Sequence, residues 1–212
     1  MFNPTDERLD ELREQIRQSL TPKRAGHILA VEDMAVRLGK LYADDDESER
    51  VLRAAALLHD VTKEKKGEEQ RALCREHGIT LTAEELCAPK THHARTATEK
   101  IRADYPDLAD DRVLSAVRYH TTGRADMSIY EKLIFLADYI DDSRTFPDCV
   151  RLRSLFWDAE PEKMTREERN THLDTVLIIA FDMTISGLLE DGAVIHPDTI
   201  AARNYLVSHK NI

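Results

Sequence analysis

A histidine and an aspartate stand side by side at His59 and Asp60, directly after the apolar run 51–58. Neutral imidazole and carboxylate both bind divalent transition metals. Behind an apolar run, the two groups are expected to face a cavity that excludes bulk water, where a metal lowers the pKa of a bound water toward neutrality. A lone pair of this kind can equally be a solvated helix end, so its interpretation depends on the other histidines and aspartates.

Three more residues of these types fall on apolar helix faces. His27 precedes Val31 by four residues and His120 follows Val117 by three, so each shares an apolar stripe. Asp138 ends an apolar run, where an unpaired buried charge is strongly unfavourable unless it is paired or bound to a metal. Each residue alone also has a structural explanation, because an inward histidine can be a hydrogen-bonded core residue and an aspartate can cap a helix or hold an arginine.

Taken together, these residues indicate a metal centre. They come from four separate predicted helices and all face inward, which is how helical bundles build metal sites. The set is His27, His59, Asp60, His120 and Asp138. Such nitrogen and oxygen ligands fit iron, manganese, zinc, cobalt or nickel.

Basic residues flank the proposed ligands at Arg24, Lys63 and Arg144. In a chain whose net charge is −10, cations at these positions indicate an anionic substrate, most simply a phosphate. The alternative is that each cation neutralises an acidic neighbour or lies at a helix end. That alternative is favoured for Lys65 and Lys66.

The elements that must position these groups are helices. The chain has 212 residues, of which 42% are hydrophobic and 33% charged, with seven glycines and seven prolines. This composition favours a single all-α domain. Helices are predicted over 6–20, 22–42, 48–60, 67–77, 82–88, 93–105, 110–120, 129–140 and 170–189, with a last one after the cap at 196–199. The first and last helices are expected to pack on a central bundle, the charged segment 160–169 to lie at the surface, and Trp157 to anchor the core.

Composition also excludes several classes of function. The acidic net charge argues against nucleic acid as a partner. No uninterrupted run of about eighteen apolar residues is present, so no membrane span is expected, and the N-terminus lacks the apolar core of a secretion signal. The cysteines, Cys74, Cys87 and Cys149, show no Cys-x-x-Cys spacing and are expected to be reduced, as in a cytoplasmic protein. Walker, dinucleotide-fold and serine-hydrolase motifs are not found.

The order His27, His59-Asp60, Asp138 resembles the HD superfamily of metal-dependent phosphohydrolases. Finer pieces between residues 24 and 204 resemble one branch, the YqeK-type symmetrical bis(5′-nucleosyl)-tetraphosphatases. These pieces are Arg24-Ala-Gly-His27, Leu57-Leu58-His59-Asp60-Val61-Thr62-Lys63, Tyr119-His120-Thr121-Thr122-Gly123, Met127-Ser128, Glu131-Lys132, Ala137-Asp138-Tyr139-Ile140, Arg144-Thr145-Phe146-Pro147, His196-Pro197-Asp198-Thr199-Ile200 and Asn204.

The resemblance implies one HD-type helical bundle over residues 1–212, with additional N- and C-terminal helices. Its HD core would span about 20–145 and its C-terminal helical extension about 146–212. It implies a divalent metal of the iron type held by His27, His59, Asp60 and Asp138. It assigns Asp60, Val61, Thr62, Lys63, His93, His120, Asp138 and Arg144 to substrate phosphates with Arg24 nearby, and Asp198, Thr199 and Asn204 to the nucleoside. Of His92 and His93, the following Ala94 favours His93.

The activity implied is metal-dependent hydrolysis of diadenosine tetraphosphate and related dinucleoside tetraphosphates to two nucleoside diphosphates. The catalytic residues would be Asp60, Lys63, His93, His120 and Arg144, with Asp60 or Asp138 able to accept a proton and the others stabilising charge on phosphate oxygens.

Two alternatives stay open for the activity. One is another HD nucleotide phosphohydrolase that acts on nucleoside monophosphates, triphosphates or guanosine alarmones. The other is a non-catalytic nucleotide-binding regulator with a structural metal. The number of ions is also open, because His93 and His120 could hold a second one, and an exposed apolar face on the terminal helices could support a homodimer.

Overall fold

A computed structural model describes residues 4–209, and in that range it contains helices and no strand. The prediction of an all-α chain is therefore confirmed. The α-helices are α1 (Asp6–Ser19), α2 (Pro22–Tyr42), α3 (Asp46–Leu58), α4 (Glu68–Glu76), α5 (Ala83–Cys87), α6 (His92–Asp104), α7 (Asp111–Tyr119), α8 (Ile129–Ile140), α9 (Pro147–Trp157), α10 (Arg166–Glu190) and α11 (Pro197–His209). Two short 3-10 helices, η1 (Pro89–Thr91) and η2 (Pro161–Lys163), complete the order.

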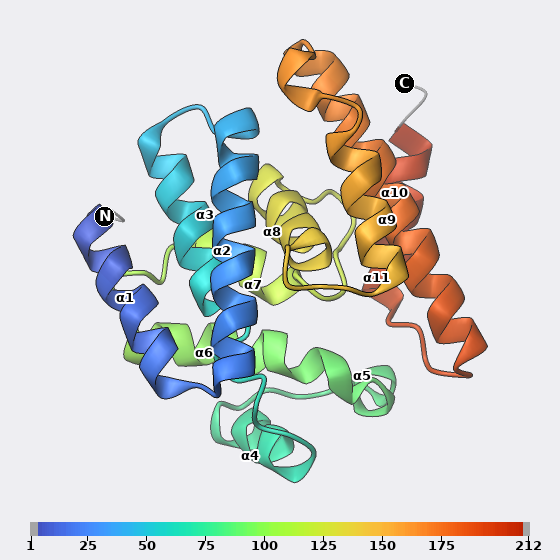
Figure 1. Ribbon diagram of the computed structural model, residues 1–212. Coiled ribbons are helices and arrows are strands. Elements are labelled where there is room, and N and C mark those ends of the chain that lie inside the picture. Colours follow the sequence, from blue (N-terminus) through green and yellow to red (C-terminus); the bar gives the residue numbers. More distant parts are fainter. Residues whose placement is uncertain (1–3, 210–212) are drawn as a thin grey trace.

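The centre of the molecule is a group of four helices, α2, α3, α7 and α8 (Figure 1). Helix α3 packs against the other three, and its residues 54–58 are completely buried. Three of these are alanines, which allow helix backbones to approach closely. Helix α1 covers α2 and α3 through Leu9, Leu12 and Ile16, all without exposed surface. This central group holds the residues that the sequence analysis singled out.

Side-chain caps fix where the helices begin. Thr21 accepts a hydrogen bond from the Arg24 amide and is followed by a proline, so α2 begins where predicted. Ser128 and Glu131 form a capping box at the start of α8. Helix α3 begins two residues earlier than predicted, at Asp46, because Asp45 caps it. It also ends earlier, so His59 and Asp60 lie in the turn after the helix.

The region after α8 departs most from the predictions. Helix α9 was not predicted, although Pro147 at its first turn and inward Cys149, Leu152 and Phe156 have helical spacing. Trp157 is only half-buried, and Phe156 is the completely buried anchor. Helix α10 begins inside the segment 160–169 that was predicted to lie at the surface, because a capping box of Thr165 and Glu168 starts it there.

The C-terminal helices form a second group, with α10 in contact with α8, α9 and α11 (Figure 1). The predicted packing of the last helix on the central bundle is therefore indirect, mainly through α10. Gly123, in the turn after α7, brings the groups together. Its φ is +62°, and a Cβ there would lie 2.5 Å from Cζ of Phe181 and 2.9 Å from Cβ of Ala202. Only glycine fits this conformation and this close approach.

Helix α10 is, within the described range, the one helix long and apolar enough by composition to cross a membrane. Its mean hydropathy is 1.5 over an 18-residue window, of which 28% is buried. Polar and charged residues interrupt this helix, so it contains no uninterrupted apolar run of about eighteen residues. One such helix is weak evidence, because core helices of soluble proteins pass the same test. Asp174 on α10 pairs with Lys132 at 2.6 Å.

Candidate metal centre and active site

Four chain segments bring the candidate ligands to one place. His27 comes from the second turn of α2, and His59 with Asp60 from the turn that ends α3. Asp138 comes from the last turn of α8, and His120 follows the last residue of α7. We refer to His27, His59, Asp60 and Asp138 as the metal-ligand cluster.

The ligand atoms of the cluster lie at distances suited to a shared cation. Nε2 of His27 is 3.0 Å from Oδ1 of Asp138 and 3.7 Å from Oδ2 of Asp60. Nε2 of His59 is 3.6 Å from Oδ2 of Asp60 and 3.8 Å from Oδ1 of Asp138. His27, His59 and Asp138 are close enough together to share one ion, and Oδ2 of Asp60 lies within 3.7 Å of both histidines.

Each imidazole is oriented by its other nitrogen. Nδ1 of His59 lies 2.6 Å from the carbonyl oxygen of Ala56. Nδ1 of His27 lies 3.4 Å from Oδ2 of Asp141, a completely buried carboxylate. Because a carbonyl or carboxylate accepts the Nδ1 proton, Nε2 is the nitrogen that faces the cluster. This pattern is usual for metal-bound histidine.

Two buried atoms at the centre make no hydrogen bond, although Nε2 of His93 lies 3.1 Å from one of them, Oδ1 of Asp60. Nε2 of His59 and Oδ1 of Asp60 are among the few buried side-chain atoms of the described residues that make no hydrogen bond. Buried polar atoms without a partner are costly. Nε2 of His59 faces the cluster and Oδ1 of Asp60 faces His93 and His120, and both are donors that a divalent transition metal binds. The residues therefore fit such an ion.

Burial and neighbouring charges shift the pKa values of the cluster. Burial lowers the pKa of His27, but Asp138 and Asp141 outweigh this effect and raise it to about 9. Burial lowers the pKa of His59 to about 4, so this imidazole is neutral at pH 7. Burial acts to raise the pKa of Asp60, but the neighbouring imidazoles and Lys63 hold it well below its usual value. Carboxylates that attract a proton to His27 also attract a cation, which would displace that proton.

A second set of ligands adjoins the first. Oδ1 of Asp60 lies 3.1 Å from Nε2 of His93 and 3.5 Å from Nε2 of His120. The two histidine Nε2 atoms are 3.0 Å apart. His59, Asp60 and His120 also form a group close enough to hold an ion. Asp60 therefore has one oxygen toward each set and could bridge two cations.

The basic residues lie against the carboxylates. Arg24 donates a hydrogen bond to Asp60, and Arg144 donates to Asp138 and, at 3.1 Å, to Asp141. These contacts are those expected if the cations neutralise acidic neighbours. Nζ of Lys63 is 2.9 Å from Nε2 of His93 and 3.9 Å from Oδ1 of Asp60. Three cations thus balance three carboxylates, and a bound divalent metal would make the site net positive and attractive to a polyphosphate.

A hollow of about 610 Å³ adjoins the cluster, and we call it the large hollow. Five residues predicted from the sequence to act in the site line it: Lys63, His120, Asp138, Arg144 and Thr199. Its apolar lining includes Phe135 and Tyr139 of α8, Leu188 of α10, and Phe146 and Val194 of the loops. It therefore combines charged groups at the cluster with an apolar wall, which is typical of sites for nucleosides and similar ligands.

Other predicted substrate residues do not line this hollow. Thr62 is buried and donates a hydrogen bond to the carbonyl of His93 at 3.0 Å, and Val61 packs against the core. The backbone of Asp198 is bonded to His196, and the exposed Asn204 contacts Arg203. His92 and His93 separate clearly. Nε2 of His92 donates to the carbonyl of Glu85 at 2.7 Å, whereas His93 faces Asp60 and Lys63.

Sequence reasoning missed Asp141 and the aromatic wall. Asp141 has no exposed surface and contacts both His27 and Arg144. Its spacing of three residues from Asp138, at the end of an apolar helix, could have revealed it. Phe135 and Tyr139 belong to the apolar helix predicted over 129–140, and nothing in the helical pattern distinguishes a core face from a cavity wall.

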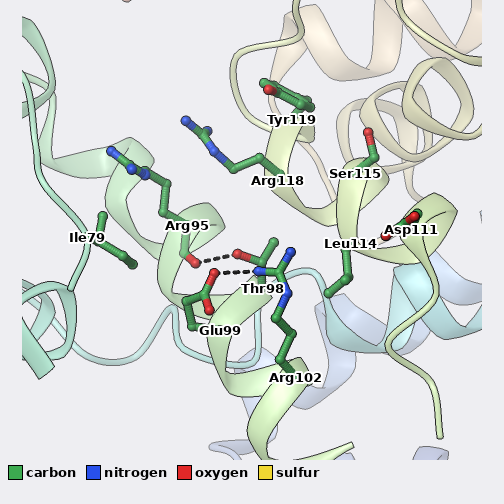
Figure 2. A pocket seen from close by; sticks show the side chains of 10 residues that line it. All are labelled: Ile79, Arg95, Thr98, Glu99, Arg102, Asp111, Leu114, Ser115, Arg118 and Tyr119. Atoms are coloured by element: carbon green, nitrogen blue, oxygen red, sulfur yellow. Dashed lines mark hydrogen bonds and ion pairs between the residues drawn. The ribbon is translucent and has the colours of Figure 1, made fainter. Parts of the chain in front are cut away.

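A separate hollow of about 430 Å³ lies between α6 and α7 (Figure 2). The side chains of Arg95 and Arg118 extend toward the same end of it (Figure 2). Both are held by the buried carboxylate of Glu85, at 2.9 Å for Arg95 and 3.6 Å for Arg118. No residue of the metal-ligand cluster lines this second hollow, so it is not part of the site.

The sequence profile of the HD domain family matches residues 24–142, which include every residue of the metal-ligand cluster. The chain therefore belongs to the HD domain family. A solved structure with the same fold is described as a predicted HD superfamily hydrolase involved in NAD metabolism, from Clostridium acetobutylicum. It is 34% identical, with a TM-score of 0.79 over 94% of this chain and 96% of that one.

The branch of the family follows from curated relatives that are named symmetrical bis(5′-nucleosyl)-tetraphosphatases. The relative from Halalkalibacterium halodurans is 34% identical over 91% of this chain and 93% of its own length. The relative from Bacillus subtilis is 29% identical over 91% of this chain and 94% of its own length. The relative from Staphylococcus aureus is 27% identical over 93% of each chain. The predicted family resemblance is confirmed.

Proposed function

We propose that this protein is a metal-dependent hydrolase that cleaves dinucleoside tetraphosphates symmetrically. One diadenosine tetraphosphate and one water would give two ADP. The observation that carries the proposal is the meeting of imidazole nitrogens and carboxylate oxygens from α2, α8 and the turn after α3, where the buried Nε2 of His59 makes no hydrogen bond. Likeness over most of the chain to relatives named for this activity supports the choice of substrate.

The metal-ligand cluster would hold the ion through His27, His59, Asp60 and Asp138. Iron is the first choice, and manganese, cobalt, nickel and zinc are compatible with the same donors. When bound, such an ion lowers the pKa of a water ligand and polarises a phosphoryl oxygen. The contacts of His93 and His120 with Asp60 support the same chemistry with a second ion.

The remaining polar groups would position the phosphate chain. Lys63, His93, His120 and Arg144 lie around the cluster and would contact the oxygens of the attacked and leaving phosphates. Arg24, on Asp60, would support them. Asp60 or Asp138 would accept the proton of the attacking water. The bond from the second phosphorus to the oxygen that bridges it to the third would break, and that oxygen would leave with the second nucleoside diphosphate.

The large hollow would take one nucleoside. Its aromatic and aliphatic wall suits a base, and Thr199 borders it at the start of α11. Asp198 and Asn204 remain predicted nucleoside contacts, and Val61 and Thr62 remain predicted contacts of the phosphate chain. The substrate would contact these four residues through their backbone atoms or after their side chains change conformation.

The setting of the enzyme is also a proposal. Its three cysteines are free thiols, which suits a cytoplasmic protein. Apolar side chains are exposed on the C-terminal helices, among them Val150 at 43%, Leu155 at 40% and Leu189 at 65%. Such a face supports a homodimer.

Elemental analysis of the purified protein, combined with chromatography of the products from diadenosine tetraphosphate, tests the proposal. We expect a stoichiometric transition metal and ADP as the only product. Released phosphate, pyrophosphate or triphosphate would indicate a different HD phosphohydrolase. A nucleotide that stays bound and unchanged for hours would indicate a regulator.

Variants of the cluster make the test specific. His59→Ala and Asp60→Ala should fold but lose metal and turnover together, while His77→Ala, outside the site, should keep both. Full turnover by either cluster variant without bound metal would refute the proposal.

A further inference from the structure

Two hollows lie beside the site and differ in chemistry, the large hollow reaching Asp138 of the cluster and the other reaching Lys63 and His93, which contact Asp60. Besides the large hollow, a smaller one of about 240 Å³ lies beside His93. The two share Lys63, Pro89 and Lys90 in their linings. A substrate that passes the cluster can therefore reach from one hollow into the other.

The smaller hollow is lined by four lysines, Lys63, Lys65, Lys66 and Lys90, and we call it the lysine hollow. Among the described residues that line it there is no carboxylate and no Phe, Tyr or Trp. Lys65 is partly neutralised by Glu69 at 3.5 Å. In the described part of the chain, no ion pair is found for Lys66 or Lys90, and both are exposed. This concentration of positive charge lies on a protein whose net charge is −10.

This chemistry fits phosphate groups and not a nucleoside. Ammonium groups bind phosphate oxygens as point charges, and they do so best where few acidic groups compete. A base needs an aromatic or aliphatic wall to stack on, and that wall belongs to the large hollow. The site is therefore asymmetric, although the substrate proposed for it is symmetrical.

We propose that the enzyme recognises one nucleoside and a chain of four phosphates, with the two distal phosphates on the lysine hollow. This inference rests on the proposed function. It follows that the second nucleoside is dispensable, so nucleoside 5′-tetraphosphates are substrates. Water adds to the second phosphorus, the bond from its bridging oxygen breaks, and the products are a nucleoside diphosphate and inorganic pyrophosphate.

The same geometry predicts discrimination by chain length. A nucleoside triphosphate has only one phosphate beyond the cleaved bond, so it makes fewer contacts with the lysines. ATP should therefore be a poor substrate, although it carries the same nucleoside as adenosine 5′-tetraphosphate. A site built only to hold a base would not separate the two.

Steady-state kinetics on diadenosine tetraphosphate, adenosine 5′-tetraphosphate and ATP test the proposal with the metal-loaded enzyme. We expect kcat/KM for adenosine 5′-tetraphosphate within about tenfold of that for the dinucleotide, and ATP at least about 100-fold lower. ADP and pyrophosphate should appear in equal amounts. Cleavage of the dinucleotide with no cleavage of adenosine 5′-tetraphosphate would overturn the proposal.

Lysine variants test the location of the distal phosphates. Lys66→Ala and Lys90→Ala should each lower kcat/KM on both tetraphosphates by about threefold to tenfold, and the loss should shrink at high salt. Both side chains are exposed, so folding should be unaffected, as circular dichroism would verify. Lys40→Ala, an exposed lysine of α2, is the matched control and should change kcat/KM by less than about twofold. Equal values for the three variants would contradict the proposal.

A binding measurement separates this inference from the proposed function. Calorimetry with inorganic tripolyphosphate needs no turnover. The Lys66→Ala/Lys90→Ala double variant should bind it at least about tenfold more weakly than Lys40→Ala does. If the wild type hydrolyses no dinucleotide, the proposed function fails, and this comparison still decides whether the lysine hollow binds phosphates. Unchanged tripolyphosphate binding in the double variant would refute the inference that the lysine hollow binds phosphates.

Discussion

At the scale of single residues, the chemistry of the site depends on which atom each side chain presents. The histidines of the metal-ligand cluster present Nε2, because Nδ1 is already bonded to a carbonyl or to Asp141. Asp60 presents one oxygen to His27 and His59 and the other to His93 and His120. The groups that contact the far side of each histidine, the Ala56 carbonyl and the Asp141 carboxylate, therefore fix the orientation of the ligands.

Substitution of Asp141 tests whether its carboxylate orients His27 for metal binding. Asp141→Asn keeps the shape of the side chain but removes the charge that orients His27 and Arg144. We expect metal affinity to fall about tenfold to 100-fold, measured by competition with a chelator. Asp142→Asn changes the neighbouring carboxylate, which is 68% exposed and contacts Arg37, and should leave the affinity unchanged. Equal affinities for the two variants would show that Asp141 does not orient the cluster.

The adjacent histidines of α6 provide a second test. His93→Ala removes a group beside Asp60 and should lower kcat by about 100-fold to 1,000-fold. His92→Ala removes a bond to the carbonyl of Glu85 and should lower the free energy of unfolding by about 1 kcal/mol, with kcat retained. Kinetics and denaturant titration on both variants separate the two roles. A loss of kcat in His92→Ala alone would reverse the assignment.

At the scale of elements, the site is built from the ends of helices. His59, Asp60 and His120 follow the last residues of α3 and α7, and Asp138 lies in the last turn of α8. A helix end can hold a side chain rigidly when the next turn is fixed by packing. For His120 that turn includes Gly123, which lies against Phe181 of α10 and Ala202 of α11.

Gly123→Ala should therefore disturb both stability and the site. The alanine would be held at positive φ and would overlap its neighbours, and we expect the free energy of unfolding to fall by about 2–4 kcal/mol. Gly187→Ala is the control, because nothing lies within 4 Å of a Cβ at that helical position. It should be neutral or stabilising by up to about 1 kcal/mol. Thermal unfolding of the two variants checks the contrast, and equal melting temperatures would contradict it.

At the scale of the whole molecule, the metal-ligand cluster places buried polar groups within an apolar core. The central helices are packed through completely buried aliphatic side chains, yet buried charged and imidazole groups meet where α2, α3 and α8 converge. Three carboxylates and three cations there compensate each other without a metal. A bound ion would add favourable contacts that the unfolded chain lacks, so stability should depend on metal.

Removal of the metal should therefore lower the melting temperature of the protein. At a free metal concentration of 100 times Kd, the ion stabilises the fold by about 2.7 kcal/mol. For a chain of this size we expect a rise of about 5–10 °C when metal is restored to chelator-treated protein. His59→Ala should show no such response in the same scan. A melting temperature that is independent of metal in the wild type would contradict a site within the core.

The sequence by itself determined the helical class, most helix boundaries and the identities of the candidate ligands. These are local properties, because capping residues such as Ser128, apolar spacing and the adjacent pair His59-Asp60 are all contained within a few residues of the chain. Likeness to a family added an expected activity. Helix α9 is also predictable from local features, namely Pro147 at its first turn and the helical spacing of Cys149, Leu152 and Phe156.

Only the tertiary structure decided which groups share a space. It showed that His93, and not His92, faces the site, and it placed Asp141 behind His27. It also brought Lys66 and Lys90, which are distant in the sequence, together beside the site. It also showed that Phe135 and Tyr139, on the apolar helix α8, line a cavity. Helical periodicity specifies that a face is covered, but not whether protein or a ligand covers it. That depends on how helices distant in the chain pack together.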